Sequence, residues 1–319
     1  MTGSRIVSLG HYQPSRVLTN DDLAQMVETN DAWIQDRVGI QTRRIAAPEE
    51  TVADMAAAAA EKALAASGLG AGDIDMVAVA TCSSVDRCPN VATRVANKLG
   101  INAPAAFDLN TACSGFAYGL AVAADLVRGG TVRHVLVIGA EKLSDWMDWD
   151  DRSTCIIFAD GAGAAVVGAA PDADSVGVGP VAWGSAGDQS QTIRINPDTR
   201  ALHQEGQAVF RWATTRVAPV ALRAIELAGL APADIDVLVP HQANLRIVEA
   251  VAKRLRSKGA RADLRVADDI VHSGNTSSAS IPLAMDHMRA DGRLRSGDTA
   301  LLVGFGAGLS YAAQVVTCP

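Results

Sequence analysis

Two stretches of the chain, ASGLGAGDIDMVAV at residues 66–79 and LAGLAPADIDVLV at residues 227–239, repeat one pattern. They align at an offset of 161 residues, so that Gly68 falls on Gly229 and Asp73 on Asp234. In each copy a glycine follows a helical stretch, and an apolar run typical of a buried strand comes a few residues later. Because this offset is too long for a solenoid repeat, we predict two similar α/β halves packed face to face.

The duplication reaches other parts of each half. HVLVIG at 134–139 is echoed by TALLVG at 299–304, and we expect the NTACSG loop around Cys113 to match the HSGNTS loop around Asn275 at an offset within one residue of 161. The PDAD stretch that follows the last strand of the first half marks the boundary. We therefore predict an N-terminal half over residues 1–172, which carries Cys113, and a C-terminal half over residues 173–319, which carries His241 and Asn275.

Helical and strand signals alternate along the chain, which is typical of an α/β fold. Thr51, with Asp54 as its capping-box partner, begins a helix that Gly68 ends. Further helices are expected over 113–127, 244–255, 278–289 and, disturbed at Pro219, 207–227. Strands are expected over 74–81, 105–109, 134–139, 155–167, 235–239, 299–303 and 311–317.

Composition excludes several classes of function. Of the 319 residues 49% are hydrophobic, which is enough for a full core and rules out a disordered chain. A net charge of −7 with only 4% aromatic residues argues against nucleic acid as the main partner. No apolar stretch reaches the roughly 18 residues of a membrane helix, and nothing resembles an export signal. We therefore expect a cytoplasmic protein without membrane contact.

Cys113 is the strongest candidate for chemistry. The chain has five cysteines and no C-x-x-C pair, which fits neither a disulfide framework nor a thiolate metal site. Cys113 follows a predicted strand and opens a predicted helix, where backbone N–H groups and the helix dipole favour a thiolate nucleophile. Taken alone, a buried structural cysteine is the commoner case.

His241 and Asn275 are expected at the carboxyl ends of strands, the edge where open α/β sheets place their sites. Each alone is more often a structural residue, but the three together at matching edges of two halves indicate one site. The GFGAGLS stretch at 304–310 precedes a strand rather than a helix, which excludes a dinucleotide loop. Its glycines suit an oxyanion hole better, because they let backbone N–H groups approach a ligand oxygen.

With these motifs in place, the chain resembles the β-ketoacyl-acyl-carrier-protein synthases III, the initiating condensing enzymes of dissociated fatty acid synthesis within the thiolase-like superfamily. HQAN followed by GNTS about thirty residues later, downstream of a cysteine loop, is highly specific to this family. The matching stretches lie at 30–46, 108–120, 150–168, 205–213, 239–247, 274–284 and 304–316. The resemblance implies a thiolase-like fold in which the two halves form a layered α-β-α-β-α core.

The resemblance also implies an active site of Cys113, His241 and Asn275. Cys113 would attack the thioester of a short acyl-CoA while the backbone N–H groups of Cys113 and Ala307 hold the oxyanion. Malonyl-acyl-carrier-protein would then lose carbon dioxide, with His241 and Asn275 donating hydrogen bonds to the enolate oxygen. The carbanion would attack the acyl-cysteine and give a 3-oxoacyl-carrier-protein. No metal or redox cofactor is implied, acyl-CoA is a substrate, and the family is a homodimer.

Substrate contacts follow from the same resemblance. Trp33 is expected to stack on the adenine of CoA, and Arg37 and Arg152 to meet the nucleotide and its phosphates. A solvated arginine and a core tryptophan are the structural alternatives. Phe305 would shield the thiol. The further residues assigned to the substrate path are Phe210, Asn244 and Cys88.

The stretch 246–265 holds seven basic and two acidic residues, a local balance of +5 in an acidic chain. Carrier proteins are acidic, so we expect this stretch to steer the partner to the catalytic mouth. A solvated helix face is the alternative. The docking residues predicted are Arg246, Lys253, Arg254 and Arg256.

Cys88 is a departure from the family pattern, because many members have phenylalanine in the loop that reaches the partner subunit's acyl pocket. The smaller side chain predicts tolerance of branched or longer primers. Three other functions stay open at this point: a starter synthase of a polyketide pathway, a cysteine hydrolase of acyl thioesters, and a non-catalytic binding module.

Overall fold

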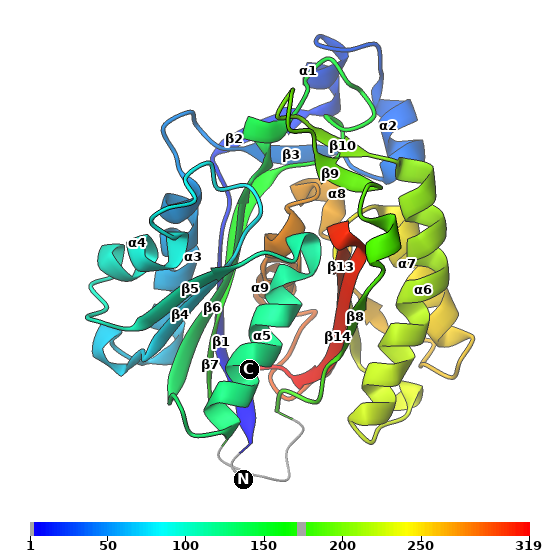
Figure 1. Cartoon of the computed structure of the whole chain (residues 1–319). Coiled ribbons are helices and arrows are strands. Elements are labelled where there is room, and N and C mark those ends of the chain that lie inside the picture. The colour runs from blue at the N-terminus through cyan, green and yellow to red at the C-terminus, as the bar shows by residue number, and fades with distance from the viewer. Residues whose placement is uncertain (1–2, 171–176) are drawn as a thin grey trace.

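The computed structural model describes residues 3–170 and 177–319 and has five layers (Figure 1). Two five-stranded sheets enclose the helices α5 (Gly115–Arg128) and α9 (Ser280–Ala290). Helices α3 (Val52–Ser67) and α4 (Val91–Lys98) cover the outer face of one sheet, and α6 (Gly206–Leu227) and α7 (Leu245–Arg256) cover the outer face of the other. The predicted layered α-β-α-β-α architecture is confirmed.

The two sheets share one strand order. The first is β1 (Ser4–Tyr12), β7 (Asp160–Ala169), β6 (His134–Lys142), β4 (Met76–Ala80) and β5 (Ala105–Leu109). The second, in the corresponding order, is β8 (Ala182–Ser185), β14 (Ser310–Thr317), β13 (Thr299–Gly306), β11 (Val237–Pro240) and β12 (Arg265–Val266). In both sheets the strand next to one edge, β4 or β11, pairs in parallel with its two neighbours, and the central strand, β6 or β13, pairs antiparallel with the next strand along the chain. The boundary predicted at residue 172 lies outside the described residues and stays a prediction.

Smaller elements complete the chain. The first half also has β2 (Arg16–Thr19), α1 (Asn20–Ala24), α2 (Asp31–Val38), β3 (Thr42–Ile45) and the 3₁₀ turns η1 (Ala71–Asp73), η2 (Ala112–Ser114) and η3 (Leu143–Trp146). The second half has η4 (Gly187–Gln189), β9 (Ile193–Ile195), β10 (Leu202–Gln204), η5 (Pro232–Asp234), α8 (Ile270–Ser273), η6 (Ser277–Ala279) and η7 (Ala307–Leu309).

Local sequence signals set the ends of several elements. Thr51 caps α3 with the predicted capping box to Asp54, and Gly68 ends the helix in the left-handed conformation at φ 74°. Pro219 lies inside α6, which nevertheless continues to Leu227, so the predicted disturbance does not divide the helix. The strand predicted from Cys155 was wrong at its start: residues 155–157 form turns, Phe158 forms an isolated bridge, and β7 begins at Asp160.

The alignment of the two catalytic loops also needs correction. The offset of 161 holds for β4 and β11, but η2 and η6, α5 and α9, and β6 and β13 all correspond at an offset of 165. The NTA turn at 110–112 therefore matches the NTS turn at 275–277, not the loop position predicted from the first repeat. Both turns place a non-glycine residue in the left-handed region, Ala112 at φ 47° and Ser277 at φ 50°.

Two glycines allow the halves to approach closely. A Cβ atom at Gly139, near the end of β6, would lie 2.3 Å from the carbonyl oxygen of Ser278 in the other half. A Cβ atom at Gly304, on the corresponding strand β13, would lie 3.1 Å from the Cα of Ser114. Each half thus uses a glycine on a central strand to admit the start of the other half's buried helix.

We expect Gly139→Ala to lower the free energy of unfolding by at least about 2 kcal/mol, because backbone atoms of Ser278 cannot move aside as a flexible side chain could. Gly72→Ala is the matched control, since a Cβ there meets nothing within 4 Å. Urea denaturation of both variants gives the comparison. Equal stability of the two variants would contradict this account of the packing.

Candidate active site

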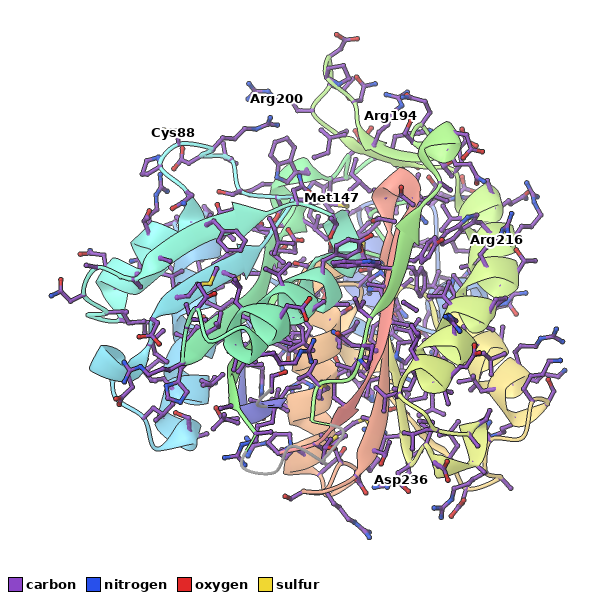
Figure 2. The ribbon with its side chains drawn as sticks, turned by 60° about the horizontal axis from the view of Figure 1, so that its bottom comes forward. Cys88, Met147, Arg194, Arg200, Arg216 and Asp236 are labelled. Carbon is purple, nitrogen blue, oxygen red and sulfur yellow. The ribbon has the colours of Figure 1, made fainter. Side chains whose placement is uncertain are left out.

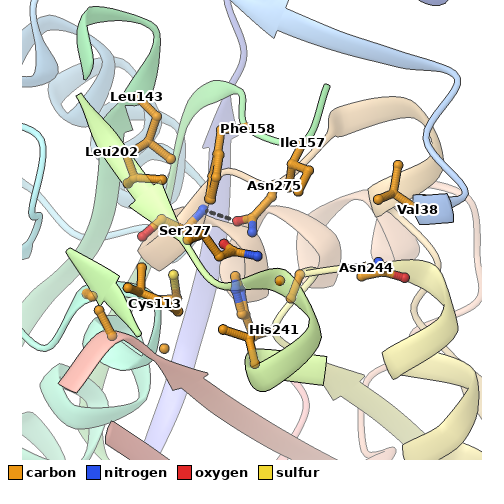
Figure 3. Close-up of a pocket in the computed structure, with 18 of the residues that line it drawn as sticks. Val38, Cys113, Leu143, Ile157, Phe158, Leu202, His241, Asn244, Asn275 and Ser277 are labelled. Carbon is orange, nitrogen blue, oxygen red and sulfur yellow. Dashed lines mark hydrogen bonds between the residues drawn. The ribbon is translucent and has the colours of Figure 1, made fainter. Parts of the chain in front are cut away.

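One deep cavity of about 720 Å³ lies between the halves and contains the three predicted catalytic residues. Cys113 comes from the first half, and His241 and Asn275 come from the second. Figure 3 shows the three side chains pointing toward a common space. His241 and Asn275 are buried, and Cys113 is half-buried.

The elements that carry these residues differ in part from expectation. Cys113 lies in η2, between the end of β5 and the start of α5, and His241 directly follows β11, both as predicted. Asn275 does not end a strand: it follows α8 and forms an isolated parallel bridge with Phe158. Its backbone N–H donates to Ile157 O, and its carbonyl accepts from Ala159 N, both at 2.9 Å. These bonds hold the asparagine against the first half of the chain.

Hydrogen bonds orient the Asn275 amide and the His241 ring. The Oδ1 atom of Asn275 accepts the N–H of Ser277 at 2.8 Å, which leaves its NH₂ group to donate into the cavity (Figure 3). The Nδ1 atom of His241 lies 2.7 Å from Ser280 Oγ, and this oxygen also accepts the N–H of Gln242 at 3.3 Å. Where the Ser280 hydroxyl donates to Nδ1, the neutral ring carries its hydrogen on Nε2, the tautomer that can donate into the cavity.

Burial lowers the pKa of His241 to about 3, so the imidazole is neutral at physiological pH. Its ring meets Phe305 edge-on, with centroids 5.1 Å apart. A neutral ring with hydrogen on Nε2 is a hydrogen-bond donor rather than a cation. Together with the Asn275 amide it supplies two neutral donors to the same space, which suits an oxygen that gains negative charge during a reaction.

The predicted Cys113 thiolate was wrong for the resting protein. Burial is the largest cause that raises the pKa of Cys113 to about 12, and the carboxylate of Glu141 acts in the same direction. The residue's own backbone N–H and the Ser277 hydroxyl act in the opposite direction but do not outweigh burial. The helix position predicted from sequence is present, yet removal from water dominates, and Cys113 is a neutral thiol.

The glycine-rich turn at 304–310 closes the cavity beside Cys113, as proposed for an oxyanion hole. A Cβ atom at Gly306 would lie 2.8 Å from the Cys113 nitrogen, so only glycine lets β13 pass here. Ala307 lines the cavity. The hydroxyl of Ser310 lies 2.8 Å from that of Ser114 and donates to Ala307 O at 2.9 Å. These bonds tie the turn before α5 to the turn between β13 and β14.

Basic and aromatic side chains form the outer part of the cavity. The guanidinium groups of Arg37 and Arg152 lie over the Trp33 ring, 5.4 and 5.0 Å from its centroid. Arg246 lies over the Phe210 ring at 5.5 Å. Asn244 caps α7 and donates to Arg37 O at 3.1 Å, so this group spans both halves. All of these predicted substrate residues line the cavity.

Sequence reasoning missed half of the cavity's arginines. Six arginines line it, and no aspartate or glutamate is among its described lining residues. The three that were not predicted are Arg87, Arg194 and Arg211. Arg87 comes from a loop, Arg194 from β9 and Arg211 from α6, and no local motif marks them. The cavity lining is thus positively charged although the whole chain has a net charge of −7, and a positive lining favours an anionic ligand.

Other predicted residues lie outside the cavity. Cys88 is exposed on an outer loop of the first half (Figure 2). Lys253, Arg254 and Arg256 are exposed on α7, with Arg256 donating to Leu264 O. Two further members of the basic stretch are neutralised: Arg261 pairs with Asp263 and Asp236, and Arg265 pairs with Asp298. The unpaired basic surface is therefore narrower than the stretch 246–265 suggests.

Within residues 3–170 and 177–319, no cluster of three or more histidine, cysteine, aspartate or glutamate side chains has the arrangement of a metal site. In the same ranges, no helix combines the length and apolar character needed to cross a membrane.

The layered fold and a cavity supplied by both halves define a condensing enzyme of the thiolase-like class. The family model described as "3-Oxoacyl-[acyl-carrier-protein (ACP)] synthase III" matches residues 107–187, and the model described as its C terminal part matches residues 225–318. The β-ketoacyl-[acyl-carrier-protein] synthase III 4 of Streptomyces coelicolor is 53% identical over 317 residues, which cover 99% of each chain. The mycobacterial synthase III of Mycobacterium avium is 49% identical over 100% of this chain and 96% of the relative.

Comparison with solved structures gives the same family. The 3-oxoacyl-(acyl carrier protein) synthase III of Pseudomonas aeruginosa superposes with a TM-score of 0.93 and 39% identity, over 99% of this chain and 98% of the other. The priming β-ketosynthase of a polyketide biosynthetic pathway superposes with a TM-score of 0.95 and 40% identity, over 100% and 97%. The chain belongs to the β-ketoacyl-[acyl-carrier-protein] synthase III family and is an acyltransferase.

We expect nitrogen NMR of histidine-labelled protein to show His241 neutral, with hydrogen on Nε2, from pH 5 to pH 9, since its pKa is lowered to about 3. Ser280→Ala removes the donor to Nδ1 and should give a mixture of tautomers at the same pH values. A signal assigned to His241 that gains a second proton near pH 6.5 would contradict the neutral, oriented ring.

Proposed function

We propose that this protein initiates fatty acid synthesis by joining a short acyl-CoA to malonyl-acyl-carrier-protein, with loss of carbon dioxide, through an acyl-Cys113 intermediate. The observation that carries this proposal is the meeting of one thiol with two neutral hydrogen-bond donors in a single cavity. A thiol accepts an acyl group, and two such donors stabilise an enolate. Carbon–carbon bond formation needs both.

The first step is transfer of the acyl group to Cys113. The sulfur attacks the thioester carbonyl, the bond to the CoA sulfur breaks, and the thiol proton ends on free CoA. The N–H groups of Cys113 and Ala307 would hold the oxyanion, supported by the close passage of Gly306. Apolar side chains surround the space for the acyl chain: Leu143, Ile156, Phe158, Leu202 and Phe305.

The second step is decarboxylation of the malonyl group. As its carboxylate leaves as carbon dioxide, negative charge moves to the thioester oxygen, where Nε2–H of His241 and the Asn275 amide would donate. The neutral histidine can donate to this oxygen from Nε2 when its hydrogen lies on that nitrogen. The resulting carbanion attacks the acyl-Cys113 carbonyl, and the cysteine sulfur leaves.

The basic outer cavity would hold the CoA phosphates and later the phosphopantetheine of the carrier. Trp33 with Arg37 and Arg152 offers a stacking surface and two cations for the nucleotide. Lys253 and Arg254 lie seven and eight residues after Arg246 along α7, so the three side chains share one helical face. They would steer an acidic carrier to the cavity mouth. No cofactor is part of the proposal.

We infer a homodimer joined along β5. This strand is an edge of its sheet in the single chain, and Phe107 on it is only half-buried. Unpaired edges are usually covered. A second copy at this edge would also cover the neighbouring loop, where Val85 is 61% exposed and Cys88 projects outward. The reaction would take place in the cytoplasm.

Priming of a polyketide pathway is the second candidate, favoured by the likeness to a priming β-ketosynthase. It uses the same chemistry and differs in the fate of the product. Hydrolysis of acyl thioesters is less well supported, because a histidine with a pKa lowered to about 3 is a poor base for activating water. A non-catalytic binding module does not account for the convergence of three chemical groups in one cavity.

Cys113→Ala should abolish acyl transfer and retain decarboxylation of malonyl-carrier-protein, since His241 and Asn275 remain in place. Asn275→Ala should leave Cys113 acylation measurable and slow condensation by about 2–4 kcal/mol of transition-state stabilisation. Mass spectrometry of the intact protein and release of labelled carbon dioxide separate the two steps. An Asn275→Ala protein that no longer acylates at all would contradict this division of roles.

With Cys88 near the partner's acyl space, we expect isobutyryl-CoA and butyryl-CoA to match acetyl-CoA in kcat/KM. Cys88→Phe should lower kcat/KM for the two larger primers about tenfold and leave acetyl-CoA nearly unchanged, because the added ring fills space that only they need. A native preference for acetyl-CoA by a wide margin, or equal effects of Cys88→Phe on all three, would overturn the expectation.

A further inference from the structure

Two histidines meet where the halves join, outside the active-site cavity. His11 lies near the end of β1 in the first half, and His287 lies on α9 in the second half. Their Nε2 atoms are 3.1 Å apart, and the rings stand edge to face with centroids 4.3 Å apart. Both side chains are partly exposed, so this pair can exchange protons with water.

A carboxylate holds the other nitrogen of each ring. The Nδ1 atom of His11 lies 2.6 Å from Asp286 Oδ2, and that of His287 lies 2.6 Å from Asp269 Oδ1. An ionised carboxylate can only accept, so both Nδ1 atoms carry hydrogen. The hydrogen bond between the Nε2 atoms needs one further hydrogen, and the ring that supplies it carries hydrogen on both nitrogens. The pair therefore consists of one imidazolium and one neutral imidazole.

The surrounding charges balance with one such proton. Asp286 also accepts from Arg289 Nε and Nη2, at 3.0 and 2.7 Å, which compensates its charge. In the part of the chain that the structure describes, Asp269 forms an ion pair with His287 alone. Without the proton, the largely buried Asp269 has no compensating charge, and a second proton would leave the cluster positive.

The pKa values of the cluster agree with this count. Burial lowers the pKa of His287, but the hydrogen bond to Asp269 and the surrounding carboxylates outweigh burial and raise it above its ordinary value. Burial raises the pKa of Asp286, but its hydrogen bonds with His11 and a guanidinium hold it below its ordinary value. His287 is therefore the ring that carries the charge, and Asp286 is ionised.

Charged groups on the other packed elements face elsewhere. A Cβ atom at Gly10 would meet α3, so the next residue, His11, points to the opposite face of the sheet and away from the charges of that helix. Strands β11 and β14 carry no charged residue. The remaining groups have partners of their own: Arg43 with Asn20 and Ile156 O, Arg44 with Pro14 O and Ser15 O, Asp160 with Ala46 N and Ser144, and Asp268 and Asp291 with Arg293.

Asp269 connects the histidine pair to Asn275. It directly precedes α8, and its carbonyl accepts two N–H groups of that helix, at 2.9 and 3.1 Å. Gly274 ends α8 at φ 69°, and a Cβ atom there would lie 2.9 Å from the Cβ of Ala159. Asn275 is the next residue. Because the chain between them is short and closely packed, a shift of Asp269 moves the catalytic amide.

The first half also contacts the rest of α8 through residues near β1 and β3. These hydrogen bonds run from Gln41 N to Val271 O at 2.7 Å, from Thr42 Oγ1 to His272 O at 2.8 Å and from Gln13 Nε2 to Ser273 Oγ at 2.9 Å. At the start of α8, the connection to the first half runs through Asp269, His287 and His11.

We propose that His11 and His287 are positioning residues, which hold one proton between them and, through Asp269, fix α8 and the Asn275 that follows it. The inference rests on the proposed function, which assigns Asn275 to condensation. The stability that the proton contributes is present below the ordinary histidine pKa of 6.5 and is lost as pH rises through the raised pKa of His287. Once the proton passes to water, two lone pairs face each other and the connection to α8 is broken.

Nitrogen NMR of histidine-labelled protein, titrated from pH 6 to pH 9, tests the shared proton. We expect one imidazolium and one neutral ring at pH 7, with a single proton lost at a midpoint at least about 0.5 pH unit above that of a free histidine. The exposed His272 is the internal control and should titrate as a free histidine does. Two independent titrations near the ordinary histidine value would overturn the proposal.

A second measurement tests the connection to Asn275. His287→Gln keeps a donor to Asp269 but cannot carry the charge. In protein already acylated at Cys113, the condensation rate should fall at least about threefold from pH 7 to pH 9, whereas His287→Gln should be about fivefold slower at pH 7 and lack this fall. Acylation of Cys113 should stay within about twofold in both proteins. His272→Ala is the matched control and should keep the native profile.

A native pH profile in His287→Gln, or equal losses in acylation and condensation, would contradict the positioning role. If His287→Gln does not fold, His11→Asn serves instead: its amide still donates to Asp286, but the nitrogen that faces His287 is gone. The NMR midpoint of His287 should then fall by at least about 0.5 pH unit, and an unmoved midpoint would overturn the pair. NMR does not depend on catalysis, so a shared proton in a protein that never condenses would refute the proposed function alone.

Discussion

The structure depends on a reciprocal close contact between its two halves. Gly139 on β6 admits the backbone of η6, and Gly304 on β13 admits the backbone of η2. Side chains at either glycine would separate the buried helices α5 and α9 from the opposite sheet. Because η2 carries Cys113 and η6 follows Asn275, the contact that packs the core also sets the distance across the cavity. Stability and catalysis therefore share one constraint.

The two duplicated turns supply different chemical groups to the cavity. NTA before Cys113 and NTS after α8 share a left-handed third residue, at Ala112 and Ser277. In the first half the next residue is the nucleophile, and in the second half the turn supplies an amide from Asn275 and a hydroxyl from Ser277. The same left-handed backbone conformation thus presents different chemical groups to the active-site cavity. The carboxylate of Glu141, on the first half, accepts hydrogen bonds from Ser277 and Ser278 of the second turn and η6.

Much of this was predictable from sequence because it is local. The repeat, the Thr51 cap and the Gly68 stop depend on neighbouring residues, and the resemblance located Cys113, His241 and Asn275. The six-arginine lining was only half predicted, since Arg87, Arg194 and Arg211 converge through tertiary folding alone. The thiolate expectation failed for the same reason: a helix start is visible in sequence, but the burial of Cys113 and the charge of Glu141 are not. The repeat register failed because extra residues in the second half, which include α8 between β12 and η6, shift the later elements from an offset of 161 to 165.

The central claim is that both halves together make a carbon–carbon bond at one sulfur. A single-turnover experiment tests it most directly: protein loaded with one equivalent of labelled acyl-CoA is mapped by peptide mass spectrometry, and malonyl-carrier-protein is then added. The account predicts that the label leaves the peptide containing Cys113 and appears on the carrier as a 3-oxoacyl group, with one carbon dioxide released per label. Label on another residue, or its release as free acid without carbon dioxide, would contradict it.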